Sequence, residues 1–314
     1  MIDRAAIPSI LRESAVTVFV NSVAGGGRAR SYLKQIQKFF ESFHVQAQFV
    51  MTNSATELES SAQTAISLGR RALFAMGGDG TFQALVNAAF GAEVLLGVFP
   101  VGGGNDFAAA LGLPDDPLKA ADAILRGEPR FVDLVRVRTA EGQTRLYAGG
   151  GGIGLDAEAA RYASGAYRRF PGRSRYIASA LRALVGFVPL DVRVDFPGSD
   201  LIPQEAKALV AAVLNSPTYG AGLRLAPGAT LEDGSVHVVL IEDIGTIGVL
   251  RLLPRLMGSG ELRTSRVKRW QVRKVRLTTQ NPTVFHGDGE ILGTTPVDIE
   301  VVPRAVQVLA PALH

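Results

Sequence analysis

The chain contains no cysteine and only four histidines among its 314 residues. The lack of cysteine excludes disulfides, thiolate metal sites and cysteine nucleophiles, and four scattered histidines argue against a multi-histidine zinc site. Nowhere do 18 apolar residues follow one another without a charge, so the sequence predicts no membrane-spanning helix. The N-terminal residues lack the long apolar core of a signal peptide. We therefore expect a cytoplasmic protein.

Hydrophobic residues make up 47% of the chain and charged residues 20%, which suits folded domains and excludes disorder as the main state. The length favours two domains, with one large domain as the alternative. Glycine is in excess, with 35 residues of 314, against a usual share of about 7%. Because no collagen period accompanies it, this excess indicates tight turns and close approach of the backbone to another group.

The first 134 residues alternate apolar, strand-like runs with segments of helical spacing. Strands are predicted at 15–20, 45–51, 72–76 and 94–99. Helices are predicted at 28–43, 56–68, 82–90 and 118–125. Continuous apolar strands that alternate with helices are typical of a parallel sheet covered on both faces.

From about residue 135 onward, short strand-like runs are separated by glycine, proline, asparagine and aspartate turns. This pattern predicts an antiparallel β-sandwich, interrupted by helical segments at 173–188 and 247–257. The predicted organisation is an α/β domain at 1–134 and a β-sandwich-like domain with helical inserts at 135–303. Residues 304–314 are a candidate to return to the first domain.

Three glycine clusters, Gly25–Gly27, Gly77–Gly80 and Gly102–Gly104, each follow closely on a predicted strand. Ligands of parallel sheets bind at the carboxyl ends of strands, and glycines there let backbone N–H groups approach a phosphate. Thr81 is a candidate helix cap or phosphate ligand, and Asp79 a candidate metal ligand or turn-ordering residue. The alternative is a set of plain strand-to-helix turns, the first of them a flexible surface turn.

Two common nucleotide motifs find no support. No Gly-Lys dipeptide occurs, which excludes a Walker P-loop. Gly149, Gly151 and Gly154 satisfy G-x-G-x-x-G, but no acidic residue lies about 20 residues further on, and the region is β-rich. We interpret this match as chance, with glycines that line an interdomain cleft or relieve crowding.

Two acidic turns are candidate sites. If the segment around Asp288 and Glu290 is extended, both carboxylates share one face and suit a general base and its helper. The alternative is an Asp-Gly hairpin turn with solvated acids, and His286 is interpreted as a turn residue. In Thr230–Ser235, carbonyls and an acidic side chain are candidate ligands of a hard cation, although a plain turn is the stronger interpretation from the residues alone.

The basic residues gather in two segments. Residues 161–182 hold six arginines and no acid, and residues 251–276 hold nine basic residues and one acid. Neighbouring apolar side chains would let such a surface rest on anionic lipid, although a solvated surface is the usual explanation. No nucleic-acid recognition module is visible and aromatic residues amount to 7%, so we expect an anionic membrane surface and no nucleic acid.

The order of the motifs NSVAGGG, GGDGTFQ, PVGGGNDFA, LEDGSV and GDGE resembles the diacylglycerol kinase catalytic-domain family. This family includes bacterial soluble lipid kinases, sphingosine kinases and ceramide kinases. The resemblance extends from about residue 16 to residue 302. GGDGT alone is shared with NAD kinases and phosphofructokinase relatives, but its combination with NDFA and a late DGE is specific for lipid kinases.

The resemblance implies a nucleotide-binding N-terminal domain and a lipid-accepting sandwich domain, with ATP and the acceptor meeting in the cleft. It implies ATP contacts at Asn21, Ser22, Val23, Ala24, Gly25, Thr52, Gly77, Gly78, Asp79, Gly80, Thr81, Phe82, Gln83, Gly103, Asn105 and Asp106. It relates Asp79, Asp106 and Asp133 to a catalytic Mg²⁺ network. It implies a structural cation site at Thr230, Asp233 and Ser235. Asp288 matches the base, a role sometimes assigned to Glu290 instead.

The sequence departs from the family pattern at two phosphate loops. Ser22 and Ala24 stand where the family has proline and serine, and Gly103 stands where it usually has threonine. Loss of one neutral hydrogen bond costs roughly 0.5–1.5 kcal/mol, so we expect altered ATP affinity or nucleotide preference and retained activity.

The sequence therefore predicts an ATP- and Mg²⁺-dependent lipid kinase that phosphorylates diacylglycerol or a related lipid alcohol. We expect it to bind the inner face of the membrane peripherally through segments 161–182 and 251–276. The sequence allows either a monomer or a homodimer. One alternative is an NAD kinase-like phosphotransferase that acts on a soluble acceptor. The other is a non-catalytic protein that binds a nucleotide or a lipid.

Overall fold

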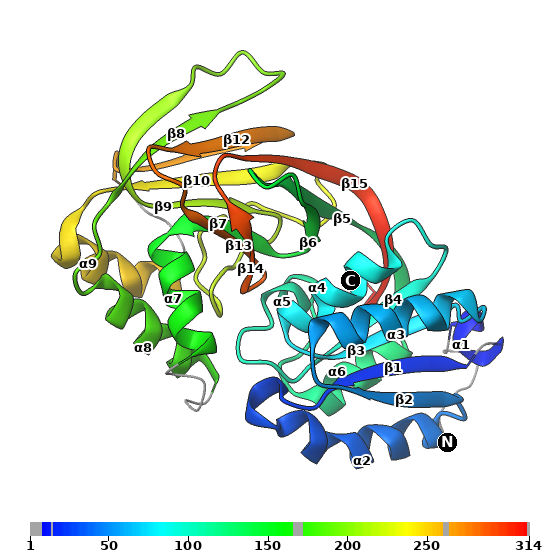
Figure 1. The fold of residues 1–314 in the computed structure, drawn as a ribbon. Helices are drawn as coiled ribbons and strands as arrows, with labels where there is room; N and C mark the ends of the chain where they lie inside the picture. The colour runs from blue at the N-terminus through cyan, green and yellow to red at the C-terminus, as the bar shows by residue number, and fades with distance from the viewer. Residues whose placement is uncertain (1–7, 14, 166–171, 260–263, 313–314) are drawn as a thin grey trace. The chain divides into compact units, whose positions relative to one another are not determined.

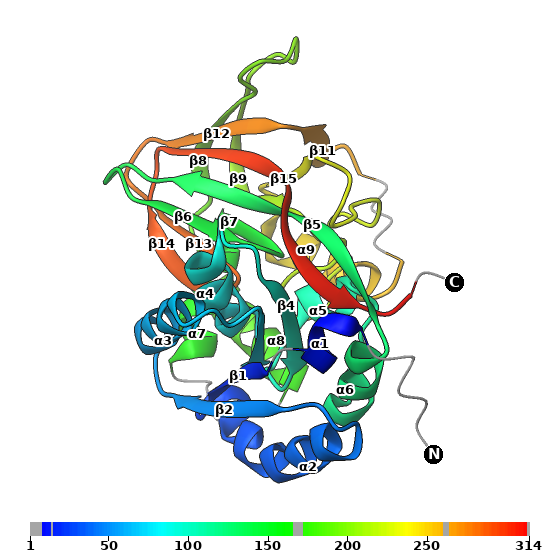
Figure 2. The ribbon, with the colours of Figure 1, turned by 90° about the vertical axis from the view of Figure 1, so that its right-hand side faces the viewer.

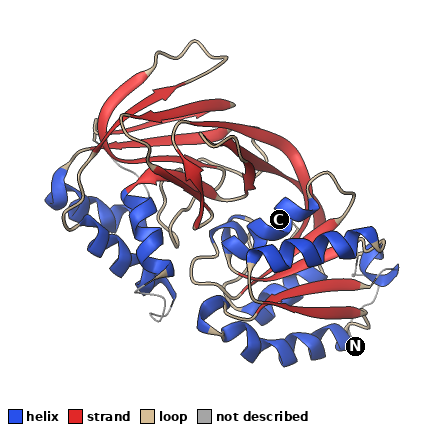
Figure 3. Ribbon diagram, viewed as in Figure 1, coloured by secondary structure: helices blue, strands red, loops and turns tan. Residues whose placement is uncertain are grey.

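The computed structural model describes residues 8–13, 15–165, 172–259 and 264–312. The chain divides into two compact units (Figures 1 and 3). Unit 1 consists of Met1–Val132 and Arg304–His314, and unit 2 of Asp133–Pro303.

Unit 1 is built on a parallel sheet in the order β2-β1-β3-β4-β15. Its strands are β1 (Val16–Asn21), β2 (Ala47–Thr52), β3 (Ala72–Gly77), β4 (Leu95–Pro100) and the end of β15 (Val297–Ala310). The apolar runs of β3 and β4 are buried along their whole length, as expected for strands covered on both faces. The predicted parallel α/β fold is confirmed.

The helices of unit 1 follow the strands in alternation. They are α1 (Ser9–Glu13), the 3₁₀ turn η2 (Ala24–Gly26), α2 (Arg28–Ser42), α3 (Ala55–Ser67), α4 (Asp79–Ala89), α5 (Asp106–Ala110) and α6 (Pro117–Leu125). Helix α2 packs against α6, and α3 against α4 (Figures 1 and 2). The chain leaves β1 toward β2 and then crosses back to β3, so the sheet has a topological switch point between the carboxyl ends of β1 and β3.

Unit 2 is β-rich. Its strands are β5 (Glu128–Arg138, which begins in unit 1), β6 (Thr144–Tyr147), β7 (Gly150–Gly154), β8 (Leu190–Asp195), β9 (Gln204–Leu214), β10 (Val236–Glu242), β11 (Val267–Val272), β12 (Lys274–Thr279), β13 (Val284–Gly287), β14 (Glu290–Thr294) and the first part of β15. They run in the order β14-β13-β7-β9-β8-β12-β15, with β10 branching from β9. The predicted sandwich-like domain is confirmed.

The long strand β9 separates two cores of unit 2. Ala211 and Val213 point into the interior of the sandwich, whereas Ala212 and Leu214 point into a second cluster. That second cluster lies beneath helices α7 (Leu155–Ser164), α8 (Gly172–Leu184) and α9 (Gly245–Met257). The glycine-rich strand β7 pairs with β9 in the same sheet, so it also lies between the two cores.

Helix α7 differs from the sequence prediction, which contained only α8 and α9 in this part of the chain. Residues 155–164 (LDAEAARYAS) are rich in alanine, glutamate and arginine, which favour helices. The glycine run immediately before them masked this signal, because it suggested a continuing series of strands and turns.

Candidate active site

The three glycine clusters of unit 1 meet at the carboxyl edge of its parallel sheet. Val101 and Gly102 donate their backbone N–H groups to the carbonyl of Gly77 at 2.9 and 3.2 Å, which joins the loops after β3 and β4. A Cβ atom on Gly102 would lie 2.4 Å from the Cα of Gly78, and one on Gly25 would lie 2.1 Å from the carbonyl oxygen of Val101. Only glycine permits this approach, so the loops form one continuous backbone surface.

Polar side chains fix the same loops. Asn21 donates from Nδ2 to the Thr81 hydroxyl at 2.9 Å, and the Asp79 carboxylate accepts the N–H of Phe107 at 3.1 Å. Asn105 adopts a left-handed conformation, with φ of 61°. Its buried Oδ1 has no hydrogen-bond partner among the described residues. A buried acceptor without a donor is costly in a native protein, which makes this oxygen a candidate ligand atom.

Helix α4 starts at the centre of this edge, because Gly78 is its N-cap. Thr81 does not cap the helix and instead lies in its first turn, where it accepts from Asn21. Helix N-termini carry exposed N–H groups and a partial positive charge, which attract anions. The edge therefore combines close-approaching backbone with the positive end of a helix dipole.

The sequence-predicted ATP contacts of unit 1 fall into two groups. Most lie in or next to the three loops at this edge: Asn21, Ser22, Val23, Ala24, Gly25, Thr52, Gly77, Gly78, Asp79, Gly80, Thr81, Gly103, Asn105 and Asp106. Phe82 and Gln83 lie in α4 and are buried, Phe82 in a stacked contact with Phe107. Phe82 thus packs against α5, the helix that follows the third loop.

In unit 2, Asp288 lies in a tight turn between β13 and β14. Asp288 and Gly289 both have positive φ, 50° and 86°, as in a two-residue hairpin turn of type I′. Its carboxylate accepts three backbone N–H groups: Oδ2 from Ala148 at 2.7 Å, and Oδ1 from Gly149 at 2.9 Å and from Gly150 at 3.1 Å. The N–H of Asp288 donates in turn to the carbonyl of Gly150 at 2.8 Å. The carboxylate is thus held in one orientation.

The backbone around Asp288 is itself supported from behind. Buried Asn215 donates from Nδ2 to the carbonyls of Asp133 and Ala148, both at 2.9 Å. Asn215 and Ser216 donate their N–H groups to the carbonyl of Gly149 at 2.8 and 3.1 Å. Ala148 and Gly149 therefore have their carbonyls anchored on one side and their N–H groups directed at Asp288.

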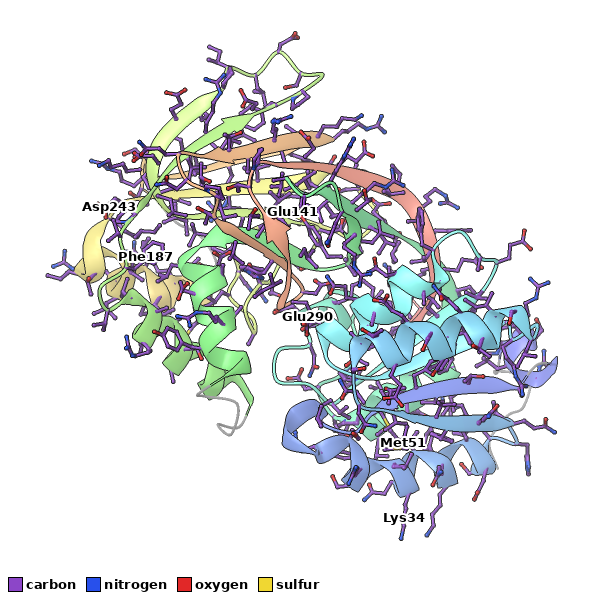
Figure 4. All side chains as sticks on the ribbon, in the orientation of Figure 1. Lys34, Met51, Glu141, Phe187, Asp243 and Glu290 are labelled. Atoms are coloured by element: carbon purple, nitrogen blue, oxygen red, sulfur yellow. The ribbon has the colours of Figure 1, made fainter. Side chains whose placement is uncertain are left out.

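Glu290 is the first residue of β14, opposite Gly287 (Figure 4). The expectation that Asp288 and Glu290 share the face of an extended strand is wrong, because the Asp-Gly turn separates them. The Glu290 side chain is exposed, and partial loss of hydration raises its pKa above the ordinary value of 4.5.

His286 was expected in a turn but lies in β13, with only 4% of its surface exposed. Its Nε2 is 2.7 Å from the hydroxyl of Tyr219, and that hydroxyl is 2.8 Å from Oδ2 of Asp156. Burial, together with the negative charge of Asp156, raises the pKa of Tyr219 well above 10. Burial, with the charge of Asp288, acts in the same direction on the pKa of Tyr147.

Asp133 and Asp233 organise the acidic turn that was predicted as a cation site. Buried Asp133 accepts the N–H of Gly234 at 2.7 Å. The Asp233 carboxylate accepts the N–H groups of Thr230 and Ser235 and contacts Nε2 of His237 at 2.8 Å. Among the described residues no group of three histidines or acids is arranged to hold a metal ion. Asp133 is part of unit 2, whereas Asp79 and Asp106 are part of unit 1.

Comparison with known families gives two matches, one for each part of the chain. Residues 15–137 match the diacylglycerol kinase catalytic domain. Residues 151–310, half of the chain, match the YegS C-terminal NAD kinase beta sandwich-like domain. The chain belongs to the diacylglycerol kinase-like family of lipid kinases.

Relatives of this family match almost the whole chain. A diacylglycerol kinase of Mycobacterium tuberculosis is 27% identical over 298 residues, and one of Bacillus subtilis is 26% identical over 297, each covering 94% of this chain and 95% of the relative. A crystal structure of a diacylglycerol kinase from Bacillus anthracis superimposes with a TM-score of 0.71 at 18% identity, covering 95% of this chain and 97% of that protein. The structural match shows a shared fold.

Sequence reasoning missed several groups at the site of this lipid kinase-family chain. The backbone N–H groups of Gly149 and Gly150 belong to the G-x-G-x-x-G match that was interpreted as chance, and Ala148 directly precedes it. The crowding expected there is present, because a Cβ on Gly152 would lie 2.4 Å from Oδ2 of Asp156. Arg28 was also missed, although it reaches the carbonyl of Gly102 at 2.7 Å. The only available signal was its position directly after the first glycine cluster.

Proposed function

We propose that the protein is an ATP- and Mg²⁺-dependent lipid kinase that transfers the γ-phosphoryl group to the hydroxyl of diacylglycerol or a related lipid alcohol. The observation that carries the proposal is the convergence of three glycine loops and the start of α4 on one edge of the sheet in unit 1. Family membership supports the lipid acceptor, and the names of the Mycobacterium tuberculosis and Bacillus subtilis relatives support diacylglycerol.

The loops fit a chain of phosphates. Their backbones approach one another so closely that no Cβ fits at Gly25 or Gly102, where it would meet a neighbouring loop at 2.1 or 2.4 Å, and a Cβ on Gly78 would lie 3.1 Å from Gly102. Backbone N–H groups in such loops bind phosphate oxygens, and the N-terminus of α4 adds a favourable dipole. Phosphoryl transfer passes through a loose transition state, so this chain contributes mainly by positioning the donor.

The donor atoms at the same edge fit Mg²⁺, which prefers oxygen ligands. The buried Oδ1 of Asn105 lacks a partner among the described residues, and Asp79 and Asp106 bring carboxylates to neighbouring loops. These residues would hold the ion, and when bound it would neutralise negative charge on the phosphate oxygens. Asp79 has a second role, because its carboxylate caps the first turn of α5.

Asp288 is the proposed general base. Its fixed carboxylate would accept the proton of the lipid hydroxyl as that oxygen attacks the phosphorus atom. The three N–H groups hold the carboxylate in one orientation, so the base is positioned before substrate binds. Glu290, two residues further along the hairpin, is the alternative base.

The departures from the family pattern lie where they affect the donor and not the base. The Ser22 hydroxyl donates to Oδ1 of Asn53 at 2.6 Å, and its N–H donates to the carbonyl of Thr52 at 3.0 Å. Ser22 thus holds the first loop against β2. Ala24 and Gly103 offer no hydroxyl, which removes neutral hydrogen bonds worth roughly 0.5–1.5 kcal/mol each. We expect weaker ATP binding with the reaction retained.

Radiolabelled ATP with Mg²⁺, offered first with mixed micelles of diacylglycerol and then with NAD, tests this function. We expect label in the organic-soluble lipid, and its loss in Asp288→Asn. The matched control is Asp298→Asn, which changes an exposed carboxylate of the same unit that pairs with Arg276. Retained labelling by Asp288→Asn would contradict the role of Asp288. Label on NAD would favour the NAD kinase-like alternative, and no label on either acceptor the non-catalytic one.

Ion pairs reduce the number of basic side chains that are free to contact an anionic membrane. Several basic residues of segments 161–182 and 251–276 are ion-paired: Arg161 with Glu158, Arg266 and Lys268 with Glu242, Lys274 with Glu300, and Arg276 with Asp298. The side chains of Arg168, Arg169, Arg173, Arg175 and Arg263 lie outside the described residues. Within the described part of the chain, these ion pairs lower the net positive charge of the expected basic surface.

Helix α9 offers a better candidate for contact with an anionic membrane. Ile247, Leu250 and Met257 are 65%, 47% and 52% exposed, and Arg251 stands on the same face by helical spacing. The end of α8 adds exposed Val185, at 71%. Helices α8 and α9 contribute to the same core cluster and are neighbours within unit 2 (Figure 1), and α9 contains no acid. No helix among the described residues has the length and apolar character needed to cross the bilayer.

Vesicle flotation tests this docking face. We expect binding to phosphatidylcholine vesicles that contain phosphatidylglycerol, weakened by salt and by the double variant Ile247→Glu/Leu250→Glu. Leu201→Glu/Ile202→Glu, an equally charged double change at loop residues that are 40% and 77% exposed, is the matched control and should bind as the wild type does. Equal binding to vesicles without phosphatidylglycerol would contradict the electrostatic part of the proposal.

A further inference from the structure

Strand β7 has an unusual composition for a strand that carries part of a site. Four of its five residues are glycine (GGGIG). Its pairing with β13 comprises two residue pairs, Gly151 with Gly287 and Gly152 with His286. Glycine-rich strands specify their register weakly, because no side chains distinguish one alignment from the next. The short β7–β13 ladder therefore needs additional contacts to hold a single register.

Polar contacts lock the two strands at both ends of β7. At its start, the N–H groups of Ala148, Gly149 and Gly150 bind the Asp288 carboxylate. At its end, Asp156 follows directly in the first turn of α7 and joins His286 of β13 through Tyr219. Asp156 and His286 also approach each other directly, with 3.4 Å between Oδ2 and Nε2.

The second of these contacts is buried and polar, so its proton positions are restricted. His286 and Tyr219 are only 4% and 8% exposed. A neutral His286 that donates from Nε2 to the Tyr219 oxygen lets the Tyr219 hydroxyl donate to Asp156. This arrangement leaves one atom of the cluster, Nδ1 of His286, without a partner among the described residues. The opposite tautomer would leave Asp156 without the tyrosine donor and would bury an unpaired N–H as well.

The glycines of β7 are required by the same cluster. A Cβ on Gly152 would lie 2.4 Å from Oδ2 of Asp156, and a Cβ on Gly150 would lie 2.8 Å from the ring of Tyr219. Larger residues would give β7 side chains to fix its register, but they would displace Asp156 and Tyr219. The composition that weakens the register thus makes room for the cluster that restores it.

We propose that Asp156, Tyr219 and His286 are positioning residues that fix the register of β7 against β13, so that three backbone N–H groups meet the Asp288 carboxylate. A shift of one residue moves a strand by about 3.3 Å and reverses which groups face the partner. The N–H groups of Gly149 and Gly150 would then lose the carboxylate oxygen that they share. This inference rests on the proposed function of Asp288 as the base.

Amide hydrogen exchange measured by NMR tests the proposal without any need for activity. In Tyr219→Phe and in the isosteric Asp156→Asn we expect the amides of Gly149 and Gly150 to exchange roughly fivefold faster or more, the factor that one hydrogen bond represents. Tyr147→Phe is the matched control, because Tyr147 is also buried and its hydroxyl donates to Val213 at 3.0 Å outside the cluster. Its exchange at Gly149 and Gly150 should match the wild type.

Unchanged exchange in both cluster variants would overturn the proposal, and so would equal acceleration in Tyr147→Phe, which would indicate general loosening. Kinetics give a second, separable result. We expect kcat of Tyr219→Phe to fall roughly tenfold to a hundredfold with KM for ATP unchanged, because misplacement of a reacting group lowers the rate of the chemical step. If the wild type phosphorylates no lipid, the proposed function fails while the exchange result still decides the register. If Asp288→Asn is inactive and Tyr219→Phe fully active, the function stands and the positioning role fails.

Discussion

At the scale of single residues, glycines with the same backbone conformation do different things in this protein. Gly25 and Gly26 are neighbours in the first loop, with φ of 58° and 71°. A Cβ on Gly25 would collide with Val101, whereas one on Gly26 would meet no atom within 4 Å. Gly26 therefore serves only the turn, and Gly25 also allows the first loop to touch the third.

This difference predicts unequal effects of alanine at the two positions. Gly26→Ala should lower the free energy of unfolding by about 1–2 kcal/mol, the cost of a left-handed conformation for a residue with a Cβ. Gly25→Ala should lower it further and should also weaken ATP binding, because the loops must separate. Urea denaturation and calorimetric titration with ATP measure both quantities. Equal losses in the two variants would refute the proposed contact between the loops.

The buried tyrosines predict a pH dependence of stability. The folded protein raises the pKa of Tyr219 well above 10, whereas the unfolded chain ionises near 10. Above pH 10 the unfolded state therefore binds fewer protons than the folded state, and the free energy of unfolding falls as the pH rises. The stability contribution of the neutral form is complete below pH 10. In Tyr219→Phe the decline above pH 10 should be shallower by up to about 1.4 kcal/mol per pH unit. Urea unfolding of both proteins at several alkaline pH values measures the difference, and parallel curves would contradict it.

At the scale of elements, the backbone carbonyl and N–H groups of the segment before β7 have different partners. Its carbonyls are bound by Asn215 and Ser216 at the end of β9, and its N–H groups point to Asp288. Strand β9 thus supports the proposed base although it contributes no side chain to it. The same strand contributes side chains to both cores of unit 2, so the residues that support Asp288 continue directly into these cores.

Asn215→Ala should therefore be costly. The change removes the buried donor that the carbonyls of Asp133 and Ala148 share, and we expect a loss of ~2–3 kcal/mol in the free energy of unfolding. Asn87→Ala is the matched control, because its Nδ2 binds one carbonyl within α4, where alanine is favoured. Urea denaturation should show a change below about 1 kcal/mol for Asn87→Ala. A similar loss in both variants would show that Asn215 has no special role.

The elements of unit 1 could be predicted from the sequence because their cause is local. Continuous apolar runs gave β3 and β4, and the glycines after them marked the carboxyl edge of the sheet. The candidate site in unit 2 was harder to predict from the sequence. The N–H groups that bind Asp288 lie 138–140 residues away in sequence, and backbone donors leave no trace in residue type. His286, Tyr219 and Asp156 come from β13, a loop and α7, so no local pattern links them.

At the scale of the whole molecule, the two proposed roles, phosphate binding and general base, are assigned to residues of different units. The phosphate loops belong to unit 1, and Asp288 with its supporting segment belongs to unit 2. Each group of residues is ordered by contacts inside its own unit. A ligand that binds one unit should therefore change hydrogen exchange mainly in the peptides of that unit.

Hydrogen–deuterium exchange read by mass spectrometry tests this assignment. MgATP should slow exchange in peptides that contain the three glycine loops, since binding stabilises the bound state by about 2.7 kcal/mol at a hundredfold excess over Kd. Magnesium with AMP, which lacks the β- and γ-phosphates, is the control and should protect these peptides less. Protection restricted to peptides within residues 133–303 would place the nucleotide in the wrong unit and contradict the proposal.

The pairing of β15 with β4 has a consequence for biosynthesis. Gln307 and Val308 complete the sheet of unit 1 beside Leu95 and Leu96, yet unit 2 lies between them in the chain. During translation the edge of β4 in unit 1 therefore stays unpaired until the whole of unit 2 has left the ribosome. The last strand to be made closes the first sheet to be started.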